Sequence, residues 1–232
     1  MTKVNFLRIS PTRREIIWGI RYLLFQIIFL PSLLGVLNQV LPFSLSSTQI
    51  NFLFFCLNFT AALLIFHRFL GEFLQPDSAD ILRISWVSAL FFAAYWVSTF
   101  LLTNVLGHFV PDFVNQNDQS IAQMSSSNYA LMFLGTVFLV PVTEECFHRG
   151  LIFRSLYSKS SIVAFLVSAA VFSAVHLINY IGSYTPLQLT ACFVQYLPAG
   201  FCLAGAYRLS GSILSPILIH MAVNAMGLLA LR

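Results

Sequence analysis

The chain is 232 residues long, and its composition is unlike that of a soluble domain. Hydrophobic residues make up 58% and charged residues only 9%, whereas soluble domains average about 25% charged residues. The mean hydropathy is +0.83. These values exclude a disordered chain, a coiled coil and a disulfide scaffold, and the 12 Lys and Arg residues form no stripe that would bind nucleic acid. A polytopic membrane protein remains.

Seven segments are apolar over about the 20 residues that a membrane-spanning helix needs. We therefore predict one all-α membrane domain over residues 1–232, a polytopic bundle of about seven transmembrane helices. The count becomes eight if the fourth segment is split or a short re-entrant piece is present. In chain order the segments are Ile16–Val40, Ile50–Leu70, Ile84–Leu106, Tyr129–Leu156, Ser161–Ile181, Leu187–Tyr207 and Ile213–Leu231.

The charged residues predict the orientation of the bundle. Nearly all Lys and Arg residues fall on alternate connections, whereas the opposite connections carry only Asp112 and Asp118. By the positive-inside rule, the N-terminus is then cytoplasmic and the C-terminus outside, and we expect a bacterial plasma membrane. Arg21 can snorkel to the basic side, and Arg232 alone lies opposite. The basic side holds Lys3, Arg8, Arg13, Arg14, Arg68, Arg83, Arg149, Arg154, Lys159 and Arg208.

The stretch Pro111–Asn128 is the one long polar connection. It is rich in Asn, Gln and Ser, so we predict a loop on the non-cytoplasmic side. A solvated linker is the simpler interpretation, and a lid over a substrate entrance is the alternative. The four cysteines stand among apolar residues without a Cys-x-x-Cys motif, which indicates small buried hydrophobes rather than a zinc ribbon or a redox pair.

Three of the predicted helices carry polar residues at membrane depth, where burial is costly and function is the usual reason for them. Residues four apart share a helix face. Glu145 can therefore pair with Arg149, which leaves Glu144 facing elsewhere. By the same spacing, Phe172 lies beside the imidazole of His176, and His220 and Asn224 point to the same side of their helix. The groups are Glu144, Glu145 and Arg149 in the fourth segment, Phe172 and His176 in the fifth, and His220 and Asn224 in the seventh.

These side chains suit hydrolysis of an amide bond. A carboxylate shielded in an apolar bundle, such as Glu144, can act as general base, and His176 can share the water or protonate the leaving amine. His220 and Asn224 can donate hydrogen bonds to the oxyanion. Alternatively, Glu144, His176 and His220 could hold a divalent metal such as zinc. The spacing His-Glu-x-x-His is absent, so the sequence does not demand a metal, and no other cofactor is predicted.

The ordered motifs resemble those of the CPBP intramembrane proteases, which include the type II CAAX prenyl endopeptidases and bacterial abortive-infection-like proteins. The family pattern is Glu-Glu-x-x-x-Arg, then Phe-x-x-x-His, then His-x-x-x-Asn or Asp, and here it covers Tyr129–Ala225. The resemblance implies an intramembrane endopeptidase that cleaves a membrane-associated, CAAX-like or other peptide, prenylated or not. It also implies that Glu144 and His176 activate water. For the family, both a metalloprotease mechanism and a metal-free glutamate mechanism are proposed.

Two other functions stay open at this point. The first is a non-catalytic membrane protein of the same fold, such as a bacteriocin self-immunity protein that binds a membrane partner. The second is a transporter, which the lack of an internal repeat disfavours. For the protease, we expect the lipid bilayer and a peptide or protein substrate as partners, with no nucleic acid. A prenylated substrate should enter laterally from the lipid on the cytoplasmic side.

Overall fold

The computed structural model describes residues 7, 9–73, 76–111 and 113–230. Most of these residues are helical and none lies in a strand, so the predicted all-α polytopic bundle is confirmed. Four of the charged residues behind the orientation prediction, Lys3, Arg8, Asp112 and Arg232, lie outside the described residues. The last residue of the seventh predicted segment, Leu231, also lies outside them.

Each predicted segment is helical, although the first and the second are each divided between two helices. Within the described residues, five runs are long and apolar enough to cross a membrane, and a bent pair makes a sixth. The seventh helix, α12 (Leu214–Ala230), has 17 residues and is apolar but shorter. The fourth run is unbroken, so it does not supply an eighth span. The five runs are α3 (Ser47–Ile65), α5 (Ser78–Phe109), Tyr129–Tyr157, Ser161–Tyr180 and α11 (Pro186–Ser210).

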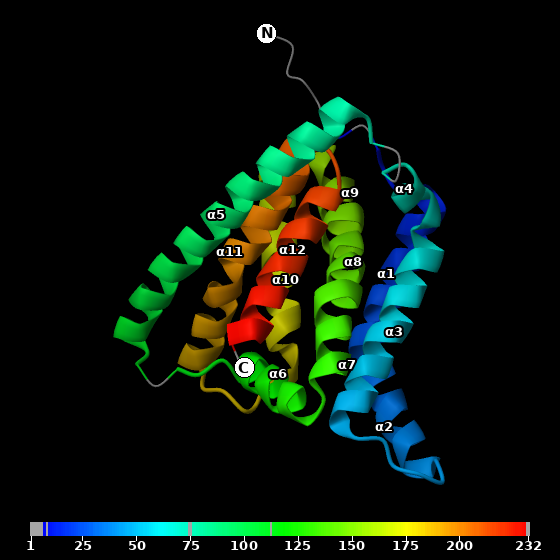
Figure 1. Cartoon of the computed structure of the whole chain (residues 1–232), viewed down its shortest axis with the longest axis vertical. Helices are drawn as coiled ribbons and strands as arrows, with labels where there is room; N and C mark the ends of the chain where they lie inside the picture. Colours follow the sequence, from blue (N-terminus) through cyan, green and yellow to red (C-terminus); the bar gives the residue numbers. More distant parts are fainter. Residues whose placement is uncertain (1–6, 8, 74–75, 112, 231–232) are drawn as a thin grey trace.

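The first predicted span is bent in its middle. Helices α1 (Arg13–Ile28) and α2 (Leu30–Val40) meet at an angle of 52°. Pro31 occupies the second position of α2. Because proline has no N–H and its ring clashes with the preceding turn, it kinks a helix at this point. The bend moves α2 away from the axis of α1 (Figure 1).

Local capping explains where several helices begin and end. Thr12, Ser46 and Thr185 each start a helix with a capping box, in which side chain and backbone satisfy each other's free groups. Helix α11 ends at Gly211, whose φ of 73° is left-handed and suits a residue without a Cβ. These signals stand in the sequence and lie close to the predicted boundaries.

The helices form a bundle with the motif-bearing runs at its centre (Figure 1). The run Tyr129–Tyr157, α10 (Ser161–Leu177), α11 and α12 lie side by side, α5 covers one flank, and α1 to α4 (His67–Gly71) cover the other. The short helix α6 (Gln116–Ser127) crosses one end of the bundle, near the C-terminus. The central helices thus have protein on both flanks.

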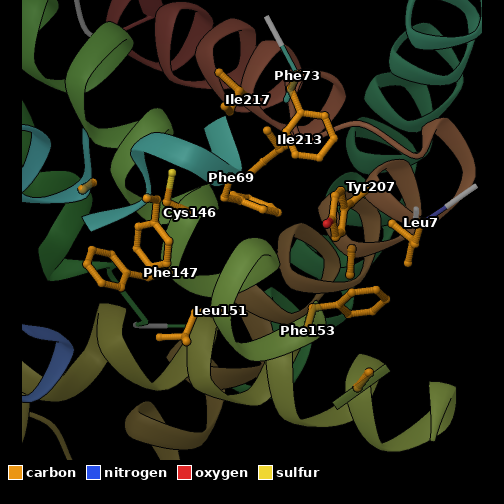
Figure 2. Close-up of a cluster of buried hydrophobic side chains, with 14 residues drawn as sticks. Leu7, Phe69, Phe73, Cys146, Phe147, Leu151, Phe153, Tyr207, Ile213 and Ile217 are labelled. Carbon is orange, nitrogen blue, oxygen red and sulfur yellow. The ribbon is translucent and has the colours of Figure 1, made fainter. Parts of the chain in front are cut away.

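An aromatic cluster joins the flank formed by α1 to α4 to the central helices at the end opposite α6. Phe69 from the N-terminal half lies with Phe147 and Phe153 of the central run and Tyr207 of α11 (Figure 2). Phe66 belongs to the same cluster. The Phe66 and Phe147 rings lie edge to face at 5.4 Å, a favoured arrangement. Cys146 lies in the same cluster. Cys146 and Cys192 are buried as predicted, while Cys56 and Cys202 are half-buried.

The prediction of a loop over Pro111–Asn128 is wrong for most of its length. Residues Gln116–Ser127 form α6, because the Asn115 side chain accepts hydrogen bonds from the backbone of Asn117 and Asp118 and so caps its first turn. The polar composition was interpreted as a loop signal, although an Asn cap followed by polar residues equally starts a surface helix.

Candidate active site

The fourth predicted segment changes its helical winding around the two glutamates. α7 (Tyr129–Phe133) leads into the π-helix η1 (Leu134–Leu139), then α8 (Val140–Glu145), the π-helix η2 (Cys146–Phe153) and α9 (Arg154–Tyr157). Pro141 stands at the second position of α8, where its missing N–H breaks the ordinary hydrogen-bond pattern. π-turns occur often at functional sites. Here they bracket the Glu144-Glu145 pair.

Glu145 and Arg149 form the ion pair that their spacing predicted. Arg149 Nη1 lies 3.1 Å from Glu145 Oε1, and both side chains are fully buried. The second guanidinium nitrogen donates to the backbone oxygen of Gly200 at 3.1 Å. The ring of Phe172 covers the guanidinium, with its centroid 4.8 Å from Cζ. A buried charge needs such partners, so this pair ties the central run to α11.

Glu145 also fixes the imidazole of His220. His220 Nδ1 lies 2.9 Å from Glu145 Oε1. Because a carboxylate can only accept a hydrogen bond, Nδ1 carries the hydrogen and donates it. The lone pair of a neutral imidazole then stays on Nε2, which lies 4.0 Å from Glu144 Oε2.

The imidazole of His176 is fixed in the same way from another helix. His176 Nδ1 lies 2.8 Å from the backbone oxygen of Phe172, which can only accept. Its Nε2 therefore also carries a lone pair, 3.9 Å from Glu144 Oε2. The Phe172 ring lies beside the imidazole, with centroids 4.6 Å apart, as the spacing predicted. Glu144 thus faces the Nε2 atoms of two imidazoles, both of which carry their hydrogen on Nδ1.

Asn224 lies one turn beyond His220 on α12. Its amide nitrogen donates to the backbone oxygen of Thr136, in η1, at 2.8 Å. This bond uses one of the two amide hydrogens and leaves the other for a further acceptor. The structure therefore brings Glu144, His176 and His220 of three helices to one place, whereas Asn224 is bound to η1, one turn along α12 from His220.

A cavity of about 150 Å³ reaches Glu144 from the flank formed by α1, α2 and α3. Its walls are mostly apolar, and the polar groups among them are few. It begins at the bend between α1 and α2, which explains why this bend matters for the site. The lining includes Gln26, Pro31, Asn58, Glu144, His148 and Asn179.

The donor types around Glu144 suit zinc, which accepts carboxylate oxygen and neutral imidazole nitrogen. The hydrogen bonds at both Nδ1 atoms resemble the outer partners that orient metal-binding histidines. Within the described residues, however, no three or more His, Cys, Asp or Glu side chains come together closely enough for a metal site. Glu144 Oε2 lies 3.9 and 4.0 Å from the two Nε2 atoms, somewhat farther than two ligands of one tetrahedral zinc, so the three groups do not form a preformed metal site in this arrangement. The mechanism below therefore uses protein groups alone.

Sequence reasoning missed the aromatic partner of His176. Tyr196, in α11, stacks on the imidazole with ring centroids 4.3 Å apart and planes inclined by 29°. Its hydroxyl accepts hydrogen bonds from the side chains of Asn115 and Asn117, each at 3.1 Å. Tyr196 stands in an apolar helix and 20 residues from the motif, so spacing alone offers no signal for it.

Comparison with known proteins decides the family of the motif region. Residues 126–226 match the family model described as type II CAAX prenyl endopeptidase Rce1-like. The chain carries an Rce1-like domain. This domain contains every motif residue described above, and the resemblance to the CPBP proteases is confirmed. The match supports a CAAX-type intramembrane protease at the family level and, with the apolar helices, an integral membrane protein.

A relative from Escherichia coli aligns with nearly the whole chain. Over 229 residues the chain is 24% identical to this relative, which is described as an uncharacterized 24.3 kDa protein, across 97% of this chain and 95% of that protein. No solved structure matches the chain.

Proposed function

We propose that the chain is an intramembrane endopeptidase that hydrolyses a peptide bond of a membrane-associated substrate with a water molecule activated by Glu144 and His176. The observation that carries the proposal is the placement of Glu144 Oε2 at 3.9 and 4.0 Å from the Nε2 atoms of His176 and His220. These gaps are too long for direct hydrogen bonds and suit two groups that share one water molecule.

The reaction begins with removal of a proton from the water. Glu144 takes this proton as general base while the water oxygen forms a bond to the carbonyl carbon. The carbonyl oxygen becomes an oxyanion and accepts a hydrogen bond from the second amide hydrogen of Asn224. His220 can donate from Nε2 only when it is doubly protonated, and Glu145, 2.9 Å from its Nδ1, offsets that charge.

The tetrahedral intermediate then collapses with cleavage of the carbon–nitrogen bond. The leaving amine must gain a proton, and the proton taken up by Glu144 reaches it directly or through Nε2 of His176. After transfer, Glu144 is again a carboxylate and both imidazoles are neutral. The cycle consumes one water and releases one acid and one amine, so the protein groups end as they began.

The cavity beside Glu144 supports a lateral route for the substrate. Residues around the α1–α2 bend and of α3 line it, and among the described lining residues Glu144 is the one carboxylate and none is Lys or Arg. An uncharged, extended peptide segment can approach from this side, and a prenylated, CAAX-like C-terminus is one such substrate. We place the site in a bacterial plasma membrane with the N-terminus cytoplasmic, on the charge distribution given above.

Cleavage by the Glu144→Gln variant tests the proposal. The assay uses internally quenched peptides, farnesylated and unmodified, with protein in detergent micelles. We expect kcat to fall by about 10²–10⁴-fold, the usual contribution of a general base, with unchanged thermal unfolding. Glu72→Gln, at an exposed position, is the matched control and should cleave as wild type does. Full cleavage by Glu144→Gln would contradict the proposal and favour the non-catalytic membrane-binding protein.

Metal content separates the two mechanisms proposed for the family. We would measure zinc in active wild-type protein and in the double variant His176→Ala/His220→Ala. Activity without stoichiometric zinc supports the water activated by Glu144. One zinc per chain that is lost in the double variant would instead assign Glu144, His176 and His220 as its ligands.

A further inference from the structure

Helix α6 is fastened to the end of the bundle where His176 lies. Tyr184 receives a hydrogen bond from the backbone of Gln116 at 2.6 Å and donates to the backbone of Val114 at 2.9 Å. Tyr180 donates to Ser120 at 3.4 Å. These contacts attach both the start and the body of α6 to the segment that follows His176 along the chain.

A third tyrosine connects α6 to the imidazole itself. Asn115 and Asn117 both donate to the Tyr196 hydroxyl, and Asn115 also donates to Gln195 at 2.9 Å. Asn115 is the residue that caps α6. The position of Tyr196 therefore depends on the first turn of α6, and the stacked imidazole depends on Tyr196.

His176 needs this second contact to point at Glu144. The hydrogen bond from Nδ1 to the Phe172 backbone restricts rotation of the ring about Cβ–Cγ, but a single hydrogen bond tolerates a range of ring angles. The rings of Phe172 and Tyr196, 4.6 and 4.3 Å away, lie against the imidazole and restrict this rotation. The direction of Nε2 toward Glu144 follows from the plane that these two rings impose.

Asp118 gives separate support for the closeness of α6 and the site. It is exposed at the surface but lines a cavity of about 370 Å³ between α5, α6 and α11. Protein atoms around it replace bulk water and raise the pKa of its carboxyl. The same cavity is lined by Asn115 and by Gln195, the neighbour of Tyr196, so the first turn of α6 faces the part of α11 that carries Tyr196.

We propose that Tyr196 is a positioning residue for His176, held in place by Asn115 and Asn117 at the start of α6. The polar connection is thus part of the catalytic apparatus, although none of its residues touches the reacting atoms. The inference rests on the proposed function for the role of His176. Its geometric core, the stacking of Tyr196 on the imidazole, does not.

The stacking is tested without any substrate by nuclear magnetic resonance. Protein with ¹³C-labelled histidine rings is studied in detergent micelles, and the His176 signal is assigned by its loss in His176→Gln. We expect an upfield displacement of this signal, because its protons lie over aromatic rings. The displacement should persist in Tyr196→Phe and decrease in Tyr196→Leu. A His176 signal that is the same in Tyr196→Leu and wild type overturns the proposal.

Tyr207 provides the matched control. It lies on the same helix, is fully buried in the aromatic cluster, and its hydroxyl has no hydrogen-bond partner within the described residues. Tyr207→Leu should leave the His176 signal unchanged, even if it lowers the thermal stability. If the upfield displacement of the His176 signal decreased equally in Tyr207→Leu and Tyr196→Leu, the bundle would have loosened in general. This result would overturn the specific role of Tyr196.

Kinetics with the quenched peptides test the positioning role. In Tyr196→Leu we expect kcat to fall by about 100-fold, the effect of a misplaced catalytic group, with KM within about twofold of wild type. Tyr196→Phe keeps the ring and loses only the two hydrogen bonds, so kcat should recover to within about tenfold of wild type. An unchanged kcat in Tyr196→Leu, or a loss in Tyr196→Phe as large as in Tyr196→Leu, overturns the role assigned to the ring.

The variant Asn117→Ala covers the case in which Tyr196→Leu does not fold. It removes one hydrogen bond to the hydroxyl and leaves both rings in place, so we expect kcat to fall by about two- to tenfold. Wild-type kcat and an unshifted His176 signal in this variant would overturn the part assigned to α6. If wild-type protein cleaves none of the peptides, the proposed function fails, while the resonance comparison still decides whether Tyr196 holds His176.

Discussion

The outer helices and the central run bury different amounts of their apolar length. Half of the most apolar window of Tyr129–Tyr157 is buried inside the protein, against 17% for α3 and none for α5. The buried residues of α1 are only Glu15 and Gly19. Since lipid is as apolar as the helices, packing and polar contacts must hold the bundle together. Those contacts gather in the central helices, while the outer helices present their side chains to lipid.

Among the variants considered, removal of Arg149 from the central run should lower the stability of the bundle most. In Arg149→Met, the buried Glu145 carboxylate loses its counter-charge, and we expect a loss of about 3–5 kcal/mol in the free energy of unfolding. Chemical unfolding in detergent measures the loss. Arg21→Met, on the exposed surface of α1, should cost less than about 1 kcal/mol. The double variant Glu145→Gln/Arg149→Met should regain most of the loss, because no charge then remains unpaired. Equal losses in Arg149→Met and Arg21→Met would show that the ion pair does not hold the core.

Two glycines, one in the central helix α11 and one in the outer helix α2, test the same comparison with smaller expected changes in the free energy of unfolding. A Cβ on Gly200 would lie 2.7 Å from Cα of Ala169, a backbone atom of α10, whereas a Cβ on Gly35 in α2 would meet nothing within 4 Å. We expect Gly200→Ala to destabilise by about 1–3 kcal/mol through overpacking. Gly35→Ala should stabilise by about 0.5–1 kcal/mol, because alanine favours a helix. Thermal unfolding of both variants decides the point, and a stabilising Gly200→Ala would contradict the close helix contact.

The smallest expected effect concerns Asp118 at the end of the bundle. Its folded-state pKa lies above the ordinary value of 3.8, so the folded protein holds this proton to higher pH than the unfolded chain does. Below that value both states are protonated and the group contributes nothing, whereas above the folded-state pKa the charge destabilises the fold. Asp118→Asn should therefore raise the unfolding temperature slightly at pH 7 and leave it unchanged below the ordinary pKa. A lower unfolding temperature of Asp118→Asn at pH 7 would contradict this prediction, because it would show that the Asp118 charge stabilises the fold.

The sequence was sufficient for features whose signals are local. The lengths of the apolar segments located the apolar helices of the bundle but not the polar helix α6, and a spacing of four residues predicted both the Glu145–Arg149 pair and the contact between Phe172 and His176. Capping residues such as Thr12 and Thr185 lie near the boundaries. Each of these signals acts within one helix, so no knowledge of the tertiary arrangement was needed.

Features that depend on contacts between distant segments could not be predicted. The bond between Glu145 and His220 joins residues 75 positions apart, and the spacing within each motif does not say which carboxylate receives the imidazole. The contact of Tyr196 with Asn115 spans 81 positions. The helical state of Gln116–Ser127 was missed for a related reason, since the tyrosines that anchor it stand far along the chain.

Phe172 links all the ionisable groups of the site except the two glutamates. Its ring covers the Arg149 guanidinium and lies 5.2, 4.6 and 6.0 Å from the rings of His148, His176 and His220. Aromatic faces carry partial negative charge, and their edges carry partial positive charge. One uncharged side chain thereby lies against four nitrogen-bearing groups and offers the guanidinium a compatible surface. A leucine would fill a similar space without this polarity, so the phenylalanine of the motif acts as an electrostatic spacer as well as a packing residue.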